Sequence, residues 1–238
     1  MAQKFNRLVL FDIDGTVLNG GRLWRECIEA SFYACCPGER LPHVSFSGKT
    51  DRQICREMLP TTLAPLLADQ RIDDIIGGYL RRIESALSAG RASEVELLPG
   101  VRELLEELTE HRTVRLGLLT GNVRAGARIK LGSVALEKFF DPCFGAFGDD
   151  HWDRYQLPPI AVSRALEEFG EVYLGKQVVI VGDTVHDVNC GKAIGVRSIA
   201  VGTGRADHRP AILEAKPDYF FDTLREKSEV LEAILSEI

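Results

Sequence analysis

Three short apolar runs, each ending in a polar cluster that contains a glycine, constrain the fold of this chain most strongly. Residues 8–11, 115–119 and 177–181 are largely apolar, and they lead into residues 12–16, 120–122 and 182–187. Such runs are typical of buried strands in parallel sheets. Doubly wound sheets bind ligands outside the carboxyl ends of their strands. We therefore expect the three clusters to meet at one edge of a sheet.

The first cluster carries two carboxylates, Asp12 and Asp14, followed by Gly15 and Thr16. Side chains alternate along an extended segment, so Asp12 and Asp14 are expected on the same side. Two anions at such short range repel each other, and a cation bound between them is the simplest explanation for the pair. A surface turn rich in Asp and Gly is the alternative interpretation, but a turn alone leaves the other two clusters unexplained.

Together the motifs resemble those of the haloacid dehalogenase-like hydrolase superfamily. The similarity consists of Asp-x-Asp-Gly-Thr at 12–16, Thr-Gly-Asn at 120–122 and Gly-Asp-Thr-x-x-Asp at 182–187, in this order over nearly the whole chain. Residues 97–105, with the sequence Leu-Leu-Pro-Gly-Val-Arg-Glu-Leu-Leu, are similar to the phosphoglycolate phosphatase-like branch.

The fold class follows from the alternation of strand and helix patterns after residue 96. This alternation predicts an α/β fold, a doubly wound parallel sheet with a Rossmann-like core and helices on both faces. Residues 18–95 show helical periodicity without a comparable apolar strand, and they resemble the small helical cap domain of the family. We predict a hydrolase core at 1–17 and 96–238, a cap domain at 18–95 and a return hinge near 88–93.

The resemblance assigns chemical roles to the first two aspartates. Asp12 resembles the nucleophile that attacks phosphorus and forms an aspartyl-phosphate. Asp14 resembles the general acid that protonates the leaving alcohol and then activates water. Family members that cleave haloacids lack this second aspartate and do not break phosphate esters. Asp14 therefore favours a phosphatase or a phosphomutase.

The same resemblance implies a Mg²⁺ site, because a hard cation prefers oxygen ligands. Its predicted ligands are Asp12, Asp183 and, in the family through its backbone carbonyl, Asp14. Asp187 is expected to hydrogen-bond to the ligands rather than to touch the metal. The phosphoryl oxygens are expected to bind Thr120 and the N–H groups around Gly121 and Asn122, although a strand-end threonine can also simply satisfy the backbone.

One family motif is missing. Most members place a lysine before the helix that precedes the last catalytic strand, whereas residues 153–159 contain none. Gln156 aligns near that position, and Arg154 lies two residues earlier. Arg154 is our choice for the missing charge, because a guanidinium can bridge a carboxylate and a phosphate. Lys130 is the reserve candidate, although a position on a solvated helix face is the preferred interpretation of this residue.

Substrate selection is expected from the cap. Residues 46–51 form a small-polar loop ahead of a helix, and similar loops close over the leaving group in this family. Gly48 and Lys49 are therefore candidate substrate-binding residues. An exposed lysine without a role is an equally good interpretation of Lys49.

The composition of the chain limits the classes of partner that it is expected to bind. The chain has 238 residues, 45% hydrophobic and 27% charged, and a net charge of −6, which gives no overall basic field for nucleic acid or an anionic membrane. No apolar run approaches the roughly 20 residues that a membrane helix needs. Six cysteines without C-x-x-C spacing indicate reduced thiols in a cytoplasmic protein.

The leading hypothesis is a Mg²⁺-dependent phosphatase, monomeric or homodimeric, for a small phosphorylated metabolite, with phosphoglycolate as a candidate. The alternatives are a phosphomutase of the β-phosphoglucomutase kind and a catalytically silent binding module. The presence of both Asp12 and Asp14 weakens the silent module.

Overall fold

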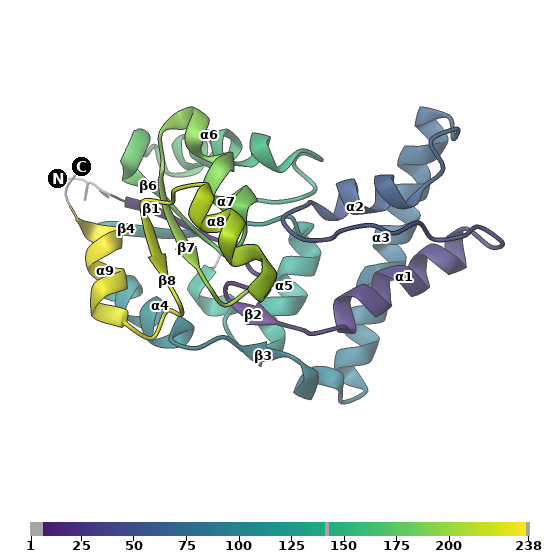
Figure 1. The fold of residues 1–238 in the computed structure, drawn as a ribbon, viewed down its shortest axis with the longest axis horizontal. Coiled ribbons are helices and arrows are strands. Elements are labelled where there is room, and N and C mark those ends of the chain that lie inside the picture. The colour runs from purple at the N-terminus through teal and green to yellow at the C-terminus, as the bar shows by residue number, and fades with distance from the viewer. Residues whose placement is uncertain (1–6, 141–142, 237–238) are drawn as a thin grey trace.

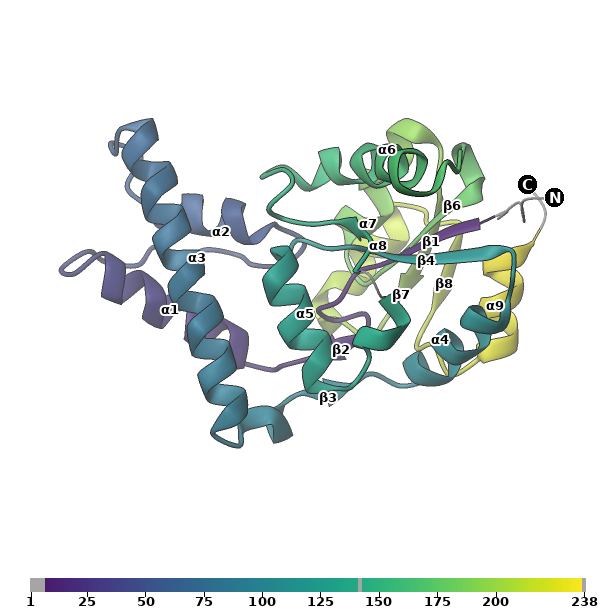
Figure 2. The ribbon, with the colours of Figure 1, turned by 180° about the vertical axis from the view of Figure 1, so that it is seen from behind.

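The structure, a computed structural model, describes residues 7–140 and 143–236. Its two parts lie side by side in Figures 1 and 2: a sheet flanked by helices, and a group of helices beyond one end of that sheet. Residues 1–6 of the first predicted core segment lie outside the described residues. No helix within the described ranges is both long and apolar enough to cross a membrane.

The central sheet has six strands in the order β5-β4-β1-β6-β7-β8, and every neighbouring pair is parallel. The strand β1 therefore lies inside the sheet, between β4 and β6. These three strands are the ones that the apolar runs predict. The strands are β1 (Arg7–Phe11), β4 (Val114–Leu119), β5 (Gly145–Ala146), β6 (Val178–Gly182), β7 (Arg197–Val201) and β8 (Tyr219–Phe221).

The two faces of the sheet are covered by different helices, as the alternation of β1 requires. Val9 and Phe11 belong to the hydrophobic cluster that includes α4 and α9, whereas Leu8 and Leu10 pack in a second cluster with α6. The predicted doubly wound α/β fold is thereby confirmed. The helices of this part are α4 (Val101–Glu110), α5 (Arg124–Ser133), α6 (Leu157–Phe169), α7 (Val185–Cys190), α8 (Arg209–Glu214) and α9 (Lys227–Leu235).

The cap helices are α1 (Leu23–Cys35), α2 (Asp51–Met58) and α3 (Pro65–Ser88), and α3 packs along α1. Two connections join them to the sheet. These connections pair as a short antiparallel ribbon, β2 (Leu18–Asn19) with β3 (Glu96–Leu97), which the sequence does not reveal because two residues carry no periodic pattern. The division of the chain at 17/18 and 95/96 stays a prediction.

Candidate active site

Asp12 is the first residue after β1, and the sheet fixes its position. Its N–H donates to the Val181 carbonyl at 2.9 Å, and its side chain is buried. Burial raises the pKa of Asp12 to about 6; Arg154 opposes this rise, and the charges of Asp187 and Asp14 add to it. The nucleophile candidate is therefore a rigidly placed carboxylate in a water-poor site.

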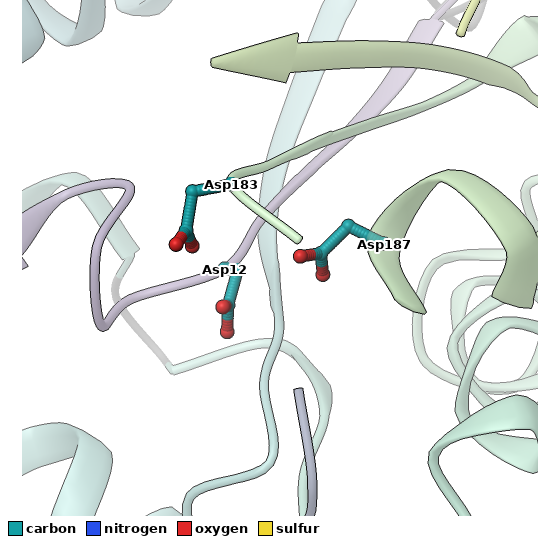
Figure 3. A group of neighbouring side chains, drawn as sticks. All are labelled: Asp12, Asp183 and Asp187. Atoms are coloured by element: carbon teal, nitrogen blue, oxygen red, sulfur yellow. The ribbon is translucent and has the colours of Figure 1, made fainter. Parts of the chain in front are cut away.

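Asp183 and Asp187 complete a carboxylate cluster with Asp12. Figure 3 shows the three side chains converging from the end of β1, the end of β6 and the helix α7, and one oxygen of each lies within 4.8 Å of the others. Asp183 Oδ1 accepts a hydrogen bond of 3.0 Å from Thr16, and burial raises the Asp183 pKa well above its usual value.

The loop after Asp14 packs tightly against this cluster. Gly15 has a φ of +87°, and a Cβ at this position would lie 2.4 Å from Asp183 Oδ2. A residue without a side chain therefore lets the loop after β1 pass this close to the end of β6.

Arg154 reaches the cluster. Its guanidinium is buried, pairs with Asp187 Oδ1, lies 3.3 Å from Asp12 Oδ1 and donates to the Leu119 carbonyl at 3.2 Å. Asp187 Oδ2 in turn accepts from the N–H and the hydroxyl of Thr184, at 2.9 and 2.6 Å. Arg154 thus brings a positive charge beside Asp12, and both oxygens of Asp187 accept hydrogen bonds from protein donors.

The structure corrects the sequence interpretation of Lys130. The sequence favours a solvated helix face for this residue, and that expectation is wrong, because the Lys130 side chain is only 3% exposed. Its Nζ lies 2.7 Å from Asp14 Oδ2. Gly126 and Ala127, one turn earlier on α5, are buried on the same face. This spacing of small residues is the signal that could have placed Lys130 inward.

Thr120 and Asn122 line the site from the end of β4. Thr120 is fully buried, and its Oγ accepts from the N–H and the side-chain Nδ2 of Asn122, at 3.3 and 2.8 Å. Asn122 Nδ2 also donates to Asp14 Oδ2 at 2.8 Å. The backbone-satisfying role of Thr120 is thus present, and its hydroxyl hydrogen stays available for an acceptor.

Asp12 and Asp14 have separate basic partners. Asp12 lies beside Arg154, whereas Asp14 lies beside Lys130. The sequence interpretation invoked one cation between the two aspartates. The structure shows that each carboxylate also has a cation of its own, which reduces the repulsion between them.

The cap loop closes one side of the site. Gly48 has a φ of +67°, and a Cβ there would lie 2.2 Å from His186 Cδ2 on the core. Lys49 pairs with Glu57 within the cap, at 2.5 Å. Ser47 Oγ lies 3.4 Å from His208 Nδ1. The loop therefore contacts core residues that the motifs do not point to, His186 and His208.

The start of α2 is hydrogen-bonded to the core loop that contains Thr120. The Asp51 N–H donates to the Gly121 carbonyl at 2.7 Å, and the Val123 N–H donates to Asp51 Oδ2 at 2.9 Å. The Thr50 hydroxyl donates to the Trp152 carbonyl at 2.6 Å. Gly121 leaves room for this contact, since a Cβ there would lie 2.1 Å from the Lys49 carbonyl oxygen.

These groups surround one cavity of about 890 Å³ between the cap and the sheet. Trp24 of α1 lines it too, and sequence analysis missed this residue because a tryptophan on an apolar helix face looks like core. Of the predicted site residues, only Asp187 does not line the cavity; those that do are Asp12, Asp14, Gly48, Lys49, Thr120, Gly121, Asn122, Arg154 and Asp183.

Known proteins share both the sequence pattern and the fold. The family described as haloacid dehalogenase-like hydrolase matches residues 9–201. Pyrophosphatase PpaX of Halalkalibacterium halodurans is 26% identical over 194 residues, which cover 82% of each chain. Phosphorylated carbohydrates phosphatase of Thermotoga maritima is 27% identical over 226 residues, 92% of this chain and 98% of the relative.

Solved structures agree on the fold. CbbY from Rhodobacter sphaeroides, in complex with phosphate, superposes with a TM-score of 0.67 at 18% identity and covers 93% of this chain and 96% of its own. A β-phosphoglucomutase from Clostridium difficile reaches a TM-score of 0.69 at 12% identity, with 97% of each chain covered. The family match spans most of the chain and contains the three strand-end motifs, so the protein belongs to the haloacid dehalogenase-like hydrolases and is an enzyme.

Proposed function

We propose that this enzyme is a Mg²⁺-dependent phosphatase that hydrolyses a small phosphorylated metabolite through an aspartyl-phosphate on Asp12. The observation that carries the proposal is that Asp12 and Asp14 line one cavity between the cap and the sheet, each beside its own buried cation. One carboxylate is then placed to attack and the other to transfer a proton.

The donor set fits a divalent cation. Asp12, Asp183 and Asp187 bring three carboxylates together and Arg154 contributes one positive charge, so two negative charges remain uncompensated among these four buried side chains. All donors are oxygens, which a hard cation such as Mg²⁺ prefers. When bound, the metal would neutralise charge on the phosphoryl oxygens.

Asp12, Asp183 and the backbone carbonyl of Asp14 would hold this metal, as the family pattern implies. Asp187 would act indirectly, because its oxygens already accept from Arg154 and Thr184. Asp187 thus fits a residue that orients Arg154 and the metal ligands.

The protein's own groups account for the remaining steps. The Asp12 carboxylate attacks phosphorus, and Asp14 protonates the leaving oxygen and later takes a proton from water. Thr120 and the N–H groups at Gly121 and Asn122 hold the transferring phosphoryl group, and Arg154 offsets charge beside Asp12. Gly48 and Lys49 contact the leaving group from the cap. Closure of the cap excludes bulk water from these transfers.

Hydrolysis is preferred over mutase chemistry because relatives at 23–28% identity are named phosphatases or pyrophosphatases. Phosphoglycolate phosphatase of Pseudomonas savastanoi, 25% identical over 245 residues, keeps phosphoglycolate among the candidate substrates. The likeness to a β-phosphoglucomutase, at 12% identity, concerns the fold alone. The proposal includes a cytoplasmic location and a monomer or homodimer that acts on a small metabolite, with no nucleic-acid or membrane partner.

The test is a panel of phosphorylated metabolites with Mg²⁺, with inorganic phosphate and the organic product measured together. We expect stoichiometric phosphate release from at least one metabolite, and no isomerised phosphate ester. An isomerised product would identify a mutase. No turnover of any ester would contradict both activities and leave the silent binding module.

A further inference from the structure

The Asp14 carboxylate is held through one of its two oxygens. Oδ2 accepts from Lys130 Nζ at 2.7 Å and from Asn122 Nδ2 at 2.8 Å. Oδ1 is shielded from water, and no described residue hydrogen-bonds to it. The two oxygens of Asp14 are thus inequivalent before any substrate binds.

Lys130 and the other buried cation of the site, Arg154, pair with different carboxylates. Asp14 is the one carboxylate with which Lys130 forms an ion pair among the described residues, whereas Arg154 is paired on the other side with Asp12 and Asp187. A buried ammonium is costly unless it has a partner. The Trp24 ring of the cap lies 4.9 Å from Nζ and covers the ammonium from the cap side. The cap therefore covers the ammonium of the Lys130–Asp14 pair.

We propose that Lys130 is a positioning residue for the acid–base step, and this inference rests on the proposed phosphatase function. Together with Asn122 it fixes Oδ2, so that the Asp14 carboxyl group meets the ester oxygen of the leaving group in one orientation. As Asp12 bonds to phosphorus, the bond from phosphorus to the ester oxygen breaks and leaves its electron pair on that oxygen. The oxygen takes the proton from the Asp14 carboxyl group, the alcohol departs, and Asp14 remains as a carboxylate.

The second half of the cycle uses the same carboxyl group. A water molecule gives one proton to the Asp14 carboxylate while its oxygen bonds to phosphorus. The bond from phosphorus to Asp12 breaks, and its electron pair returns to the Asp12 carboxylate. Asp14 is protonated again, as at the start, and one phosphate has been released. Both steps need the Asp14 carboxyl group in one orientation, which the two donors to Oδ2 supply.

A comparison of leaving groups distinguishes a positioning role from a purely structural one, because a structural defect would slow the cleavage of all esters alike. An alkoxide is a poor leaving group and needs the proton, whereas 2,4-dinitrophenolate departs without one. In the full-length enzyme with Mg²⁺, Lys130→Met should lower kcat/KM for an alkyl phosphate on the order of 100-fold. It should lower kcat/KM for 2,4-dinitrophenyl phosphate by no more than about threefold. The ratio kcat/KM is informative because it ends at departure of the leaving group.

Arg128→Met is the matched control, since Arg128 is an exposed basic residue on the same helix. It should leave both substrates unchanged. Lys130→Arg keeps the charge and should recover part of the alkyl phosphate rate. If Lys130→Met does not fold, the same comparison of the two substrates is made with Lys130→Arg, which should slow the alkyl phosphate more than 2,4-dinitrophenyl phosphate.

An equal loss on all leaving groups, or a rise in KM alone, would overturn the positioning role and assign Lys130 to folding or to substrate binding. Failure of the proposed function would look different, because the wild-type enzyme itself would then cleave no phosphate ester.

Discussion

The active site has two sides with different origins. The Asp12 side consists of Asp183, Asp187 and Arg154, all supplied by the ends of the sheet and its connecting segments and all buried. The Asp14 side consists of Lys130 and Asn122 from the core, together with groups of the cap. The first side is complete without the cap, whereas the second is completed by it. We infer that attack on phosphorus is organised by the rigid sheet, and that proton transfer and substrate choice are organised at the cap interface.

The largest expected effect belongs to the Asp12 side. Asp12→Asn should abolish turnover with the fold intact, because the attacking carboxylate is lost while the shape is nearly kept. The measurement is steady-state phosphate release, with circular dichroism to check folding. Asp74→Asn, an exposed aspartate of α3, is the control and should be fully active. Retention of more than about a tenth of kcat, a deficit near 1.4 kcal/mol, would remove Asp12 from the nucleophile role.

Removal of the metal should have a comparable effect on the same side. Activity should vanish with EDTA and return with Mg²⁺, whereas Ca²⁺ should inhibit because its looser, higher coordination disturbs in-line geometry. Asp183→Ala should raise the Mg²⁺ requirement or eliminate activity. A titration of phosphate release against Mg²⁺ measures both. Full activity of the wild-type enzyme in chelator would refute the cofactor assignment.

Arg154→Ala should lower kcat on the order of 100-fold, because the charge beside Asp12 is lost. It should also destabilise the fold by about 3–5 kcal/mol, since Asp187 remains buried without its ion-pair partner. Arg154→Lys should recover part of kcat, as a point charge replaces a fork only partially. Kinetics and urea unfolding of the two variants measure both effects. A healthy Arg154→Ala enzyme would show that Arg154 does not replace the family lysine.

The smallest expected effect concerns the cap side and depends on pH. Burial raises the pKa of Asp51 from 3.8 to about 6; Lys130 and the Val123 N–H oppose this rise. The folded state thus binds the proton more tightly than the unfolded state. The stability that protonated Asp51 contributes is fully present below about pH 3.8 and is lost as the pH rises through about 6.

Asp51→Asn removes this titration while keeping an oxygen for the Val123 N–H. Relative to wild type, its free energy of unfolding should therefore increase by up to about 3 kcal/mol between about pH 4 and pH 7.5. Urea unfolding of both proteins at several pH values measures the difference, and the raised pKa values of Asp12 and Asp183 cancel in the comparison. A difference that does not vary with pH would show that Asp51 is not buried as the structure places it.

The two sides also differ in how far the sequence predicts them. The Asp12 side was predictable because strand periodicity and strand ends are local signals, and parallel strands bring their carboxyl ends to one edge. Arg154 could be sought because the motif spacing gives its place in the chain. The doubly wound sheet follows from the same strand and helix patterns.

The Asp14 side depends on contacts between segments far apart in sequence. Lys130 follows Arg124 and Arg128 on α5, and the charges alone do not show which of the three side chains points inward. The hydrogen bond from the Asp51 N–H to the Gly121 carbonyl joins residues about 70 positions apart through backbone groups, which every residue possesses. Trp24 is found only once α1 is placed over the strand ends.

Gly121 and Gly148 have a consequence for how enzymes of this architecture diverge. A Cβ on Gly121 would meet the Lys49 carbonyl at 2.1 Å, and a Cβ on Gly148 would meet the Gly121 carbonyl at the same distance. Any larger residue at either position has to displace a backbone segment, and the segment beside Gly121 carries the cap loop. Substrate range can therefore drift through core positions whose own side chains never touch a substrate, and a survey of pocket-lining side chains alone would miss that route.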